Sequence, residues 1–289
     1  MIETVEVSTV GGKENASFRG MLVTDLDGTL LNSRRELQKQ DYKTLKTLGK
    51  RGYARAVATG RHLHSFSKVA DDDFPIDYVI FSSGAGICDF HERKIIRKVT
   101  LETAEVERAA RFLFSLGLDF MVHKPIPENH MFFYCSSDRN NRDFERRVKM
   151  YEEFSEPLLM DTERFDHASQ LLAIEPHESG RKAYDIIREI LSEYTVLRTT
   201  SPLDGSSTWI EIFPQSVSKS RTACWLAQWL GLEKEKILSI GNDYNDLDLL
   251  EWAGTSFVVA NAPEELRMKF NEVSSNDEGG FSEAVRKWW

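Results

Sequence analysis

The stretch MLVTDLDGTLL, which runs from Met21 to Leu31, decides the fold. Its first three residues are apolar, as is typical of a strand buried in a parallel sheet. Asp25 and Asp27 follow at alternate positions, so both carboxylates leave the end of this strand on the same side. In open α/β sheets, ligands bind at that end of the strands. Two neighbouring anions repel each other, which predicts a divalent cation, a shared proton, or both at this place.

Two other interpretations of this stretch have to be weighed. The pattern D-x-D-G is also common in surface turns. A calcium-binding loop would place its ligands at the spacing of Asp25, Asp27, Thr29 and Glu36. However, Leu30 occupies the position where such a loop needs glycine, and the segment before it is predicted to be a strand. These observations disfavour calcium, while the turn interpretation stays open for this stretch alone.

Composition and charge narrow the class of protein. The chain has 289 residues, of which 41% are hydrophobic and 29% charged, and this fits a soluble globular protein of one or two domains. The net charge of −9 argues against a nucleic-acid-binding protein, and no apolar run approaches the length of a membrane span. The acidic first residues do not resemble a signal peptide. Cys88, Cys135 and Cys224 are too far apart for a zinc pattern, so we expect a reduced, cytoplasmic protein.

The first part of the chain alternates strands and helices. Residues 1–20 end in a Gly-rich polar stretch and are predicted to be an N-terminal extension. Strands are predicted at 21–26, 53–58 and 78–81, and a helix at 41–51. This order predicts a parallel sheet with right-handed crossovers. The predicted strands end in the small or polar sequences DLDGT, TGR and SSGAG.

An inserted domain is predicted at 87–210, because the pattern changes there to paired short strands and amphipathic helices. Strand pairs followed by helices predict an α+β unit with an antiparallel sheet that is open on one face. The first pattern returns after Pro214, with a helix at 219–230 and a strand at 236–240. The predicted core domain therefore comprises 21–86 and 211–289.

Four polar clusters lie at predicted sheet ends or next to them. Together they supply two carboxylates, a hydroxyl, an ammonium group and further oxygen ligands, which is the set of groups that phosphoryl transfer requires. The clusters are Asp25 with Asp27, Thr59 with Arg61, Lys219, and the segment Asn242–Asp246.

These clusters resemble the four motifs of the haloacid dehalogenase superfamily, and in particular of its Cof-type phosphatases with an inserted α/β (type IIB) cap. DLDGT at 25–29 is similar to the first motif, ATGR at 58–61 to the second, SKS around Lys219 to the third, and GNDYND at 241–246 to the fourth. The resemblance covers 21–289 in order, including the place and length of the insertion. It implies a Rossmann-like parallel-sheet core domain with an inserted α+β cap domain.

The resemblance also implies a role for each matching residue. Asp25 would be the nucleophile that forms an aspartyl-phosphate, and Asp27 would protonate the leaving oxygen and then activate water. Thr59 and Lys219 would bind phosphoryl oxygens, and Lys219 would also hold Asp25. Further implied substrate-binding residues are Gly60, Arg61 and Asn245.

A magnesium site is implied at the same place. Mg²⁺ favours a few carboxylates together with waters and substrate oxygens. The implied ligands are Asp25, the backbone carbonyl of Asp27, and members of the fourth motif among Asn242, Asp243 and Asp246. Asn242 departs from the family pattern, which has Asp there, so either Asn242 or Asp243 would be the ligand. Ser220 is a second departure, because the third motif usually has Gly after the Lys.

The sequence thus predicts a Mg²⁺-dependent phosphatase that hydrolyses small phosphorylated metabolites, with sugar phosphates as the default substrates. One alternative is a phosphomutase of the same superfamily. Another is a catalytically weakened small-molecule-binding protein, because Asn242 carries no charge at the metal site. His123 and His130 of the cap either meet the polar end of the substrate or are ordinary core or surface histidines. We expect no nucleic-acid or membrane partner, and a monomer or homodimer.

Overall fold

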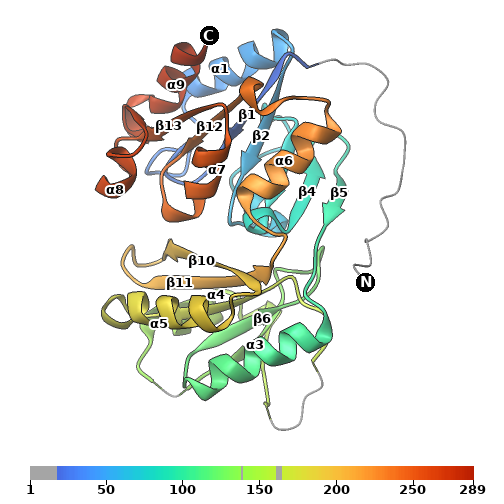
Figure 1. The fold of residues 1–289 in the computed structure, drawn as a ribbon, viewed down its shortest axis with the longest axis vertical. Coiled ribbons are helices and arrows are strands. Elements are labelled where there is room, and N and C mark those ends of the chain that lie inside the picture. The colour runs from blue at the N-terminus through green and yellow to red at the C-terminus, as the bar shows by residue number, and fades with distance from the viewer. Residues whose placement is uncertain (1–17, 138, 161–164) are drawn as a thin grey trace. The chain divides into compact units, whose positions relative to one another are not determined.

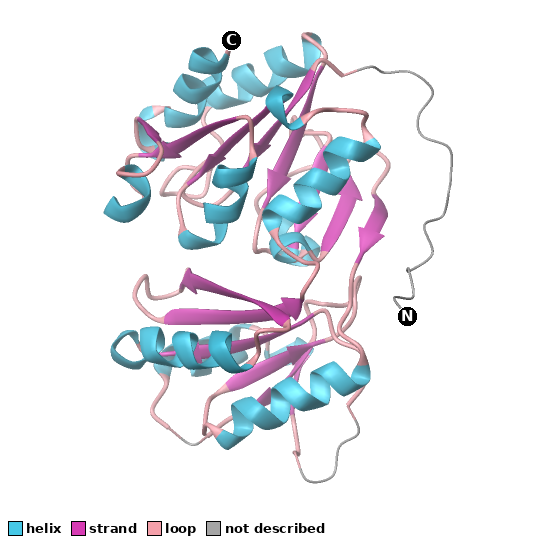
Figure 2. Ribbon diagram, in the orientation of Figure 1, coloured by secondary structure: helices cyan, strands magenta, loops and turns pink. Residues whose placement is uncertain are grey.

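The computed structural model describes residues 18–137, 139–160 and 165–289, and they form two compact units (Figures 1 and 2). One unit comprises the described residues up to Lys98 together with Ser218–Trp289, and the other comprises Val99–Val217. The extension predicted for 1–20 lies outside the described residues except for its last three. Of these, Gly20 already belongs to the first strand, β1 (Gly20–Thr24).

The core unit is built on an eight-stranded sheet in the order β14-β13-β12-β1-β2-β3-β4-β5. The strands from β14 to β3 pair in parallel, as predicted, whereas β4 and β5 pair antiparallel. Their bounds are β2 (Tyr53–Ala58), β3 (Tyr78–Phe81), β4 (Gly86–Asp89), β5 (Lys94–Lys98), β12 (Ile237–Gly241), β13 (Thr255–Val259) and β14 (Asn271–Val273).

Helices cover both faces of this sheet (Figure 1). The helices are α1 (Lys39–Lys50), α2 (Leu63–Phe66), α6 (Lys219–Trp229), α7 (Leu247–Trp252), α8 (Glu264–Arg267) and α9 (Gly280–Trp288). Met21 and Val23 of β1 pack with Ala223 and Leu226 of α6 in one buried cluster. All four side chains are fully buried, so the apolar strand and the helical spacing predicted from sequence combine into one core.

The boundaries of the inserted unit differ from the prediction of 87–210. Because β4 pairs with β3 and β5 pairs with β4, the segment up to Lys98 belongs to the core sheet. At the other end, β11 (Thr208–Pro214) still belongs to the second sheet. Both predicted boundaries therefore came too early in the chain. A short strand has the same alternating pattern in whichever sheet it pairs, so the pattern alone does not place it.

The inserted unit contains a six-stranded sheet in the order β10-β11-β9-β6-β7-β8. All neighbours pair antiparallel except β7 and β8, which are parallel. The elements are α3 (Thr103–Ser115), β6 (Phe120–His123), β7 (Phe132–Cys135), α4 (Arg142–Met150), β8 (Ser155–Pro157), β9 (Gln170–Glu175), α5 (His177–Ile190) and β10 (Tyr194–Thr200).

Helices pack on both faces of the second sheet, so the prediction of one open face was wrong. Val106 and Leu113 of α3 and Ile187 of α5 share a buried cluster with one face. Phe144 of α4 packs with Trp209 in a second cluster. The sequence predicts amphipathic helices in this unit, but periodicity does not say which face of a sheet a helix covers.

His123 is a buried core histidine in this unit. Its side chain is 1% exposed, and its Nδ1 lies 2.9 Å from the carbonyl oxygen of Asn129, to which it donates a hydrogen bond. Burial, with a further contribution from the positive charge of Arg147, lowers the pKa of His123 to about 3. The imidazole is therefore neutral at physiological pH.

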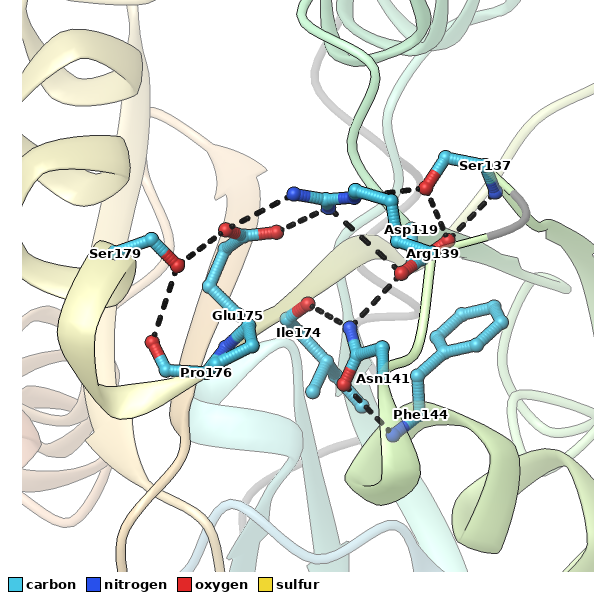
Figure 3. A network of polar contacts seen from close by, with 9 residues as sticks. All are labelled: Asp119, Ser137, Arg139, Asn141, Phe144, Ile174, Glu175, Pro176 and Ser179. Carbon is cyan, nitrogen blue, oxygen red and sulfur yellow. Dashed lines mark hydrogen bonds and ion pairs between the residues drawn. The ribbon is translucent and has the colours of Figure 1, made fainter.

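A network of buried polar groups joins several elements of the same unit (Figure 3). Asp119 is fully buried and accepts hydrogen bonds from the backbone N–H of Ser137 at 2.6 Å, from its hydroxyl at 2.7 Å, and from Asn141 Nδ2 at 2.9 Å. Arg139 lies between Asp119, at 3.7 Å, and the buried Glu175, at 2.5 Å. The network thus connects the start of β6, the start of α4 and the end of β9.

No helix in the described part of the chain combines the length and the hydrophobicity that crossing a bilayer requires.

We predict that Asp119→Ala destabilises the protein by about 3–5 kcal/mol, because it leaves the Ser137 backbone N–H and Asn141 Nδ2 without their buried acceptor, whereas Arg139 keeps Glu175. Urea unfolding followed by circular dichroism measures this. The matched control is Asp185→Ala, which removes an exposed ion pair with Arg181 and should cost less than about 1 kcal/mol. Equal losses for the two variants would show that the network does not stabilise the unit.

Candidate active site

The predicted site residues of the core unit lie at the carboxyl ends of three neighbouring strands. Asp25 follows β1, Thr59 follows β2, and Asn242 follows β12, and these strands are adjacent in the order β12-β1-β2. The backbone N–H of Asp25 continues the pairing by bonding the carbonyl of Ile240 at 2.9 Å. Lys219 is the first residue of α6. The structure therefore brings the first, third and fourth motifs together, and the second lies on the adjoining strand.

Lys219 is shared by two carboxylates. Its Nζ donates to Asp25 Oδ1 at 2.7 Å and to Asp246 Oδ1 at 2.6 Å, and its side chain is fully buried. Burial alone would lower the pKa of Lys219, but the charges of Asp246 and Asp25 outweigh it and the pKa is raised. The ammonium group is therefore charged at neutral pH, and it links segments that lie far apart in the sequence.

Asp25 is buried beside two other carboxylates, Asp246 and Asp27, and one ammonium group, that of Lys219. Burial raises the pKa of Asp25 to about 7; Lys219 opposes this shift, and the neighbouring carboxylates Asp246 and Asp27 add to it. One oxygen of Asp25 is held by Lys219. The other oxygen makes no hydrogen bond to the described residues. It can be reached from solvent, because 9% of the side-chain surface of Asp25 is exposed. The carboxylate is thus fixed on one side and accessible on the other.

Asp246 organises the loop after β12. Its Oδ1 accepts from Lys219, while its Oδ2 accepts from the backbone N–H groups of Asn242 at 2.9 Å and Asp243 at 3.1 Å. The side chain is fully buried. Both carboxylate oxygens of Asp246 are therefore already used to position Lys219 and the turn. An exposed metal ligand would instead have an oxygen without a protein partner.

Asn242 points its side chain toward the first motif. Thr29 Oγ donates to Asn242 Oδ1 at 3.1 Å. Gly28 has a φ of +77°, and a Cβ there would come within 2.6 Å of Asn242 Nδ2, so this turn needs glycine for two reasons. By contrast, the Asp243 carboxylate accepts from the backbone N–H of Tyr244 at 2.8 Å and caps its own turn.

The second motif is held by its backbone and by a neighbouring turn. Thr59 is buried, and its hydroxyl oxygen accepts from the backbone N–H of Arg61 at 3.1 Å. The turn at Ser82 and Ser83 donates backbone hydrogen bonds to the carbonyls of Arg61 and Thr59 at 2.9 and 3.0 Å. Gly60, which lies between Thr59 and Arg61, is exposed.

Two predicted substrate-binding residues have different surroundings. Arg61 binds Asp27 through two short hydrogen bonds, each of 2.6 Å. Asn245 lies in a 3₁₀ turn after β12, and its side chain makes no hydrogen bond to the described residues. Arg61 therefore lies beside the first motif, where its observed partner is the carboxylate of Asp27.

Sequence reasoning missed two supports of this site. Ser82 and Ser83 both have positive φ values, of 48° and 53°, which are uncommon for serine and give no signal in the SSGAG sequence. Ser220 Oγ donates to Asp248 Oδ2 at 2.5 Å and ties the start of α6 to α7. The departure at Ser220 therefore adds a contact beside Lys219.

The oxygens of this site fit a divalent cation. Asp25, Asp27 and Asp246 bring three carboxylates near each other, and burial together with these neighbouring charges raises the pKa of Asp25. No three His, Cys, Asp or Glu side chains among the described residues converge on one metal position. The oxygens that could hold a cation here are a carboxylate oxygen of Asp25, the carbonyl of Asp27, and the side chain of Asn242 or Asp243, and such hard donors suit Mg²⁺.

Comparison with known proteins gives a consistent result. A model of the haloacid dehalogenase-like hydrolase family matches residues 22–285. The putative phosphatase YxeH of Bacillus subtilis is 26% identical over 280 residues, which cover 92% of this chain and 97% of that protein. The 5-amino-6-(5-phospho-D-ribitylamino)uracil phosphatase YwtE of the same organism is 28% identical over 282 residues, with 90% and 95% covered.

The fold is also similar to solved structures. The subclass IIB sugar phosphatase BT4131 of the haloacid dehalogenase superfamily has a TM-score of 0.73 at 19% identity, with 93% of this chain and 98% of that chain covered. The predicted architecture, a parallel-sheet core with an inserted second sheet, is thereby confirmed.

We predict that Asn242→Asp tightens Mg²⁺ binding roughly tenfold, because it adds charge at an oxygen that Thr29 already orients. Asp243→Asn should change the affinity little, since that carboxylate caps its own turn. Isothermal titration calorimetry of Mg²⁺ into the two variants measures this directly. An unchanged affinity in Asn242→Asp together with a large loss in Asp243→Asn would make Asp243 the ligand.

Proposed function

Because this chain belongs to the haloacid dehalogenase-like hydrolase family, in its Cof-type IIB branch, we propose that it hydrolyses sugar phosphates or similar polyol phosphates through a phosphorylated Asp25. The chain is a phosphoric monoester hydrolase that acts on small phosphorylated metabolites. The observation that carries the proposed mechanism is the shared Lys219, which holds one oxygen of Asp25 and leaves the other accessible.

In the proposed first step, the Asp25 carboxylate attacks phosphorus in line with the leaving oxygen. The new oxygen–phosphorus bond forms as the ester bond breaks, and the proton of the Asp27 carboxyl passes to the leaving alkoxide. The Thr59 hydroxyl and the Lys219 ammonium donate hydrogen bonds to phosphoryl oxygens. Thr59 lies at the end of β2, the strand next to β1, and Lys219 contacts Asp25, and both placements support these roles.

In the proposed second step, Asp27 accepts a proton from water as the water oxygen attacks the phosphorus of phosphorylated Asp25. The bond between phosphorus and the Asp25 oxygen breaks, and inorganic phosphate leaves. Mg²⁺, when bound, would neutralise charge on the phosphoryl oxygens and on the crowded carboxylates. Asp25, the Asp27 carbonyl and Asn242 would hold it, with Asp243 as the alternative ligand and Asp246 fixing the loop.

The substrate class is proposed from the relatives and from the inserted unit. BT4131 is named a sugar phosphatase, and YwtE is named a phosphatase of a phosphoribityl compound. Both kinds of substrate carry phosphate on a hydroxylated carbon chain. We propose that Val99–Val217 is the cap that selects the organic part of the substrate.

The three cysteines are free thiols, which supports the proposed reducing cytoplasm. The oligomeric state stays a prediction of monomer or homodimer.

We predict that Asp25→Asn lowers phosphatase turnover by more than about 10³-fold, because an amide does not attack phosphorus at a useful rate. The fold should survive, since the change removes one charge from a crowded acidic cluster and leaves Lys219 paired with Asp246. The matched control is Asp72→Asn, whose side chain is 99% exposed and which should keep wild-type activity. Phosphate release from a panel of sugar monophosphates, with and without Mg²⁺, is the measurement.

Two outcomes of this panel would replace the proposal. Conversion of one sugar phosphate into an isomer without phosphate release would identify a phosphomutase. Binding of a sugar phosphate with no turnover at any Mg²⁺ concentration would identify the weakened binding protein. Activity of Asp25→Asn above a tenth of wild type would refute the assignment of the nucleophile.

A further inference from the structure

The guanidinium of Arg61 donates two parallel hydrogen bonds to the carboxylate of Asp27. Arg61 Nε donates to Asp27 Oδ2 and Nη2 donates to Oδ1, each at 2.6 Å. The side chain of Asp27 is 38% exposed, so packing alone does not fix its orientation. Among the described residues, Arg61 provides the only hydrogen bonds to this carboxylate. Its plane is therefore set by the plane of the guanidinium.

Arg61 is itself held at three points. Its Nη1 donates to the carbonyl of Ser65 at 3.2 Å. Its backbone N–H donates to Thr59 Oγ at 3.1 Å, and its carbonyl accepts from the backbone N–H of Ser82 at 2.9 Å. Because Ser82 and its neighbour Ser83 are in the left-handed region, this support depends on a strained turn. Such strain persists where the surrounding structure requires that conformation.

We propose that Arg61 is a positioning residue for Asp27, and that it acts through this carboxyl instead of binding the substrate as the sequence predicted. The inference rests on the proposed function, in which Asp27 passes a proton to the leaving oxygen and later takes one from water. A proton donor must lie within hydrogen-bond reach of the oxygen that it protonates. A carboxyl that rotated freely in this half-exposed position would spend little time in that geometry. The two hydrogen bonds from the Arg61 guanidinium prevent this rotation.

A lysine would supply the same charge without the same geometry. Its ammonium is a point charge on a flexible stem, whereas the guanidinium presents two donors in one plane. Arg61→Lys should therefore restore electrostatics and folding but not the fixed plane of Asp27. This variant separates positioning from charge.

The test compares two substrates that differ in their need for a proton. An alkyl phosphate, such as a sugar phosphate, has a poor leaving group that must be protonated as the ester bond breaks. Nitrophenolate leaves from p-nitrophenyl phosphate without a proton. For each substrate kcat/KM reports the steps up to the first loss of the leaving group, so a defect in proton donation should affect only the alkyl phosphate.

The variants are Arg61→Ala and Arg61→Lys, with Arg34→Ala as the matched control. Arg34 is 78% exposed and forms an ion pair with the exposed Glu36, so its replacement should leave both activities unchanged. We expect Arg61→Ala to lower kcat/KM at least about tenfold for the alkyl phosphate, which is part of the roughly 10²–10⁴-fold that general acid catalysis contributes. For p-nitrophenyl phosphate the loss should stay below about threefold, and Arg61→Lys should give an intermediate selectivity.

A second readout follows from the later role of Asp27. If the hydrolysis of phosphorylated Asp25 also needs a positioned Asp27, Arg61→Ala should lower kcat for p-nitrophenyl phosphate more than kcat/KM. A burst of nitrophenolate should then precede the steady state. A merely structural loss of active protein would lower kcat and kcat/KM by the same factor for both substrates.

The outcomes separate this inference from the proposed function. If Arg61→Ala lowers kcat/KM equally for the two substrates, mainly by raising KM, Arg61 is a substrate-binding residue and the inference is overturned. Asp27→Asn is the reference, because it should show the full selectivity between the two substrates. If Asp27→Asn shows no such selectivity, the proposed role of Asp27 is wrong. If it does and Arg61→Ala does not, only the inference about Arg61 is wrong.

Discussion

The contact of one buried ammonium group with two carboxylates is the interaction on which the rest of the core unit depends. Lys219 bonds Asp25 after β1 and Asp246 after β12, and it is fully buried between them. A buried charge is tolerated only when it is paired and hydrogen-bonded, and Asp25 and Asp246 together provide these contacts for Lys219. The start of α6 is thereby held against two strand ends, although 194 residues separate Lys219 from Asp25. The core sheet can thus accept a long insertion without losing its site.

Short turns at the strand ends decide which oxygens and N–H groups converge. Asp246 uses one oxygen for Lys219 and the other for two backbone N–H groups, so the ammonium and the loop after β12 share a support. Gly28 leaves room for Asn242, and the serine turn after β3 holds the second motif. The strands determine where the site residues lie, and the turns determine which way their oxygens and N–H groups point. The chemistry therefore depends on a few residues with unusual backbone conformations. This is why the same fold serves different activities.

Much of this arrangement could be predicted from local sequence. β2 and β3 have the bounds that were predicted, and the first, third and fourth motifs contain the residues that meet at Lys219. What failed was pairing. The strands β4 and β5 were assigned to the insertion, because a two-residue period shows that a strand exists but not which strand it joins. The bond from Arg61 to Asp27 was missed for a similar reason, since a motif names a residue but not the direction of a long side chain.

The central claim, that Asp25 carries the phosphoryl group, can be tested on the wild-type protein by trapping. Borohydride reduces an acyl phosphate to an alcohol and leaves a free carboxylate unchanged, so reduction during turnover of a sugar phosphate with Mg²⁺ marks the phosphorylated residue. Peptide mass spectrometry should then find homoserine in place of Asp25, in an amount that depends on substrate and metal. Reduction at another residue, or none at all while phosphate is still released, would contradict the account.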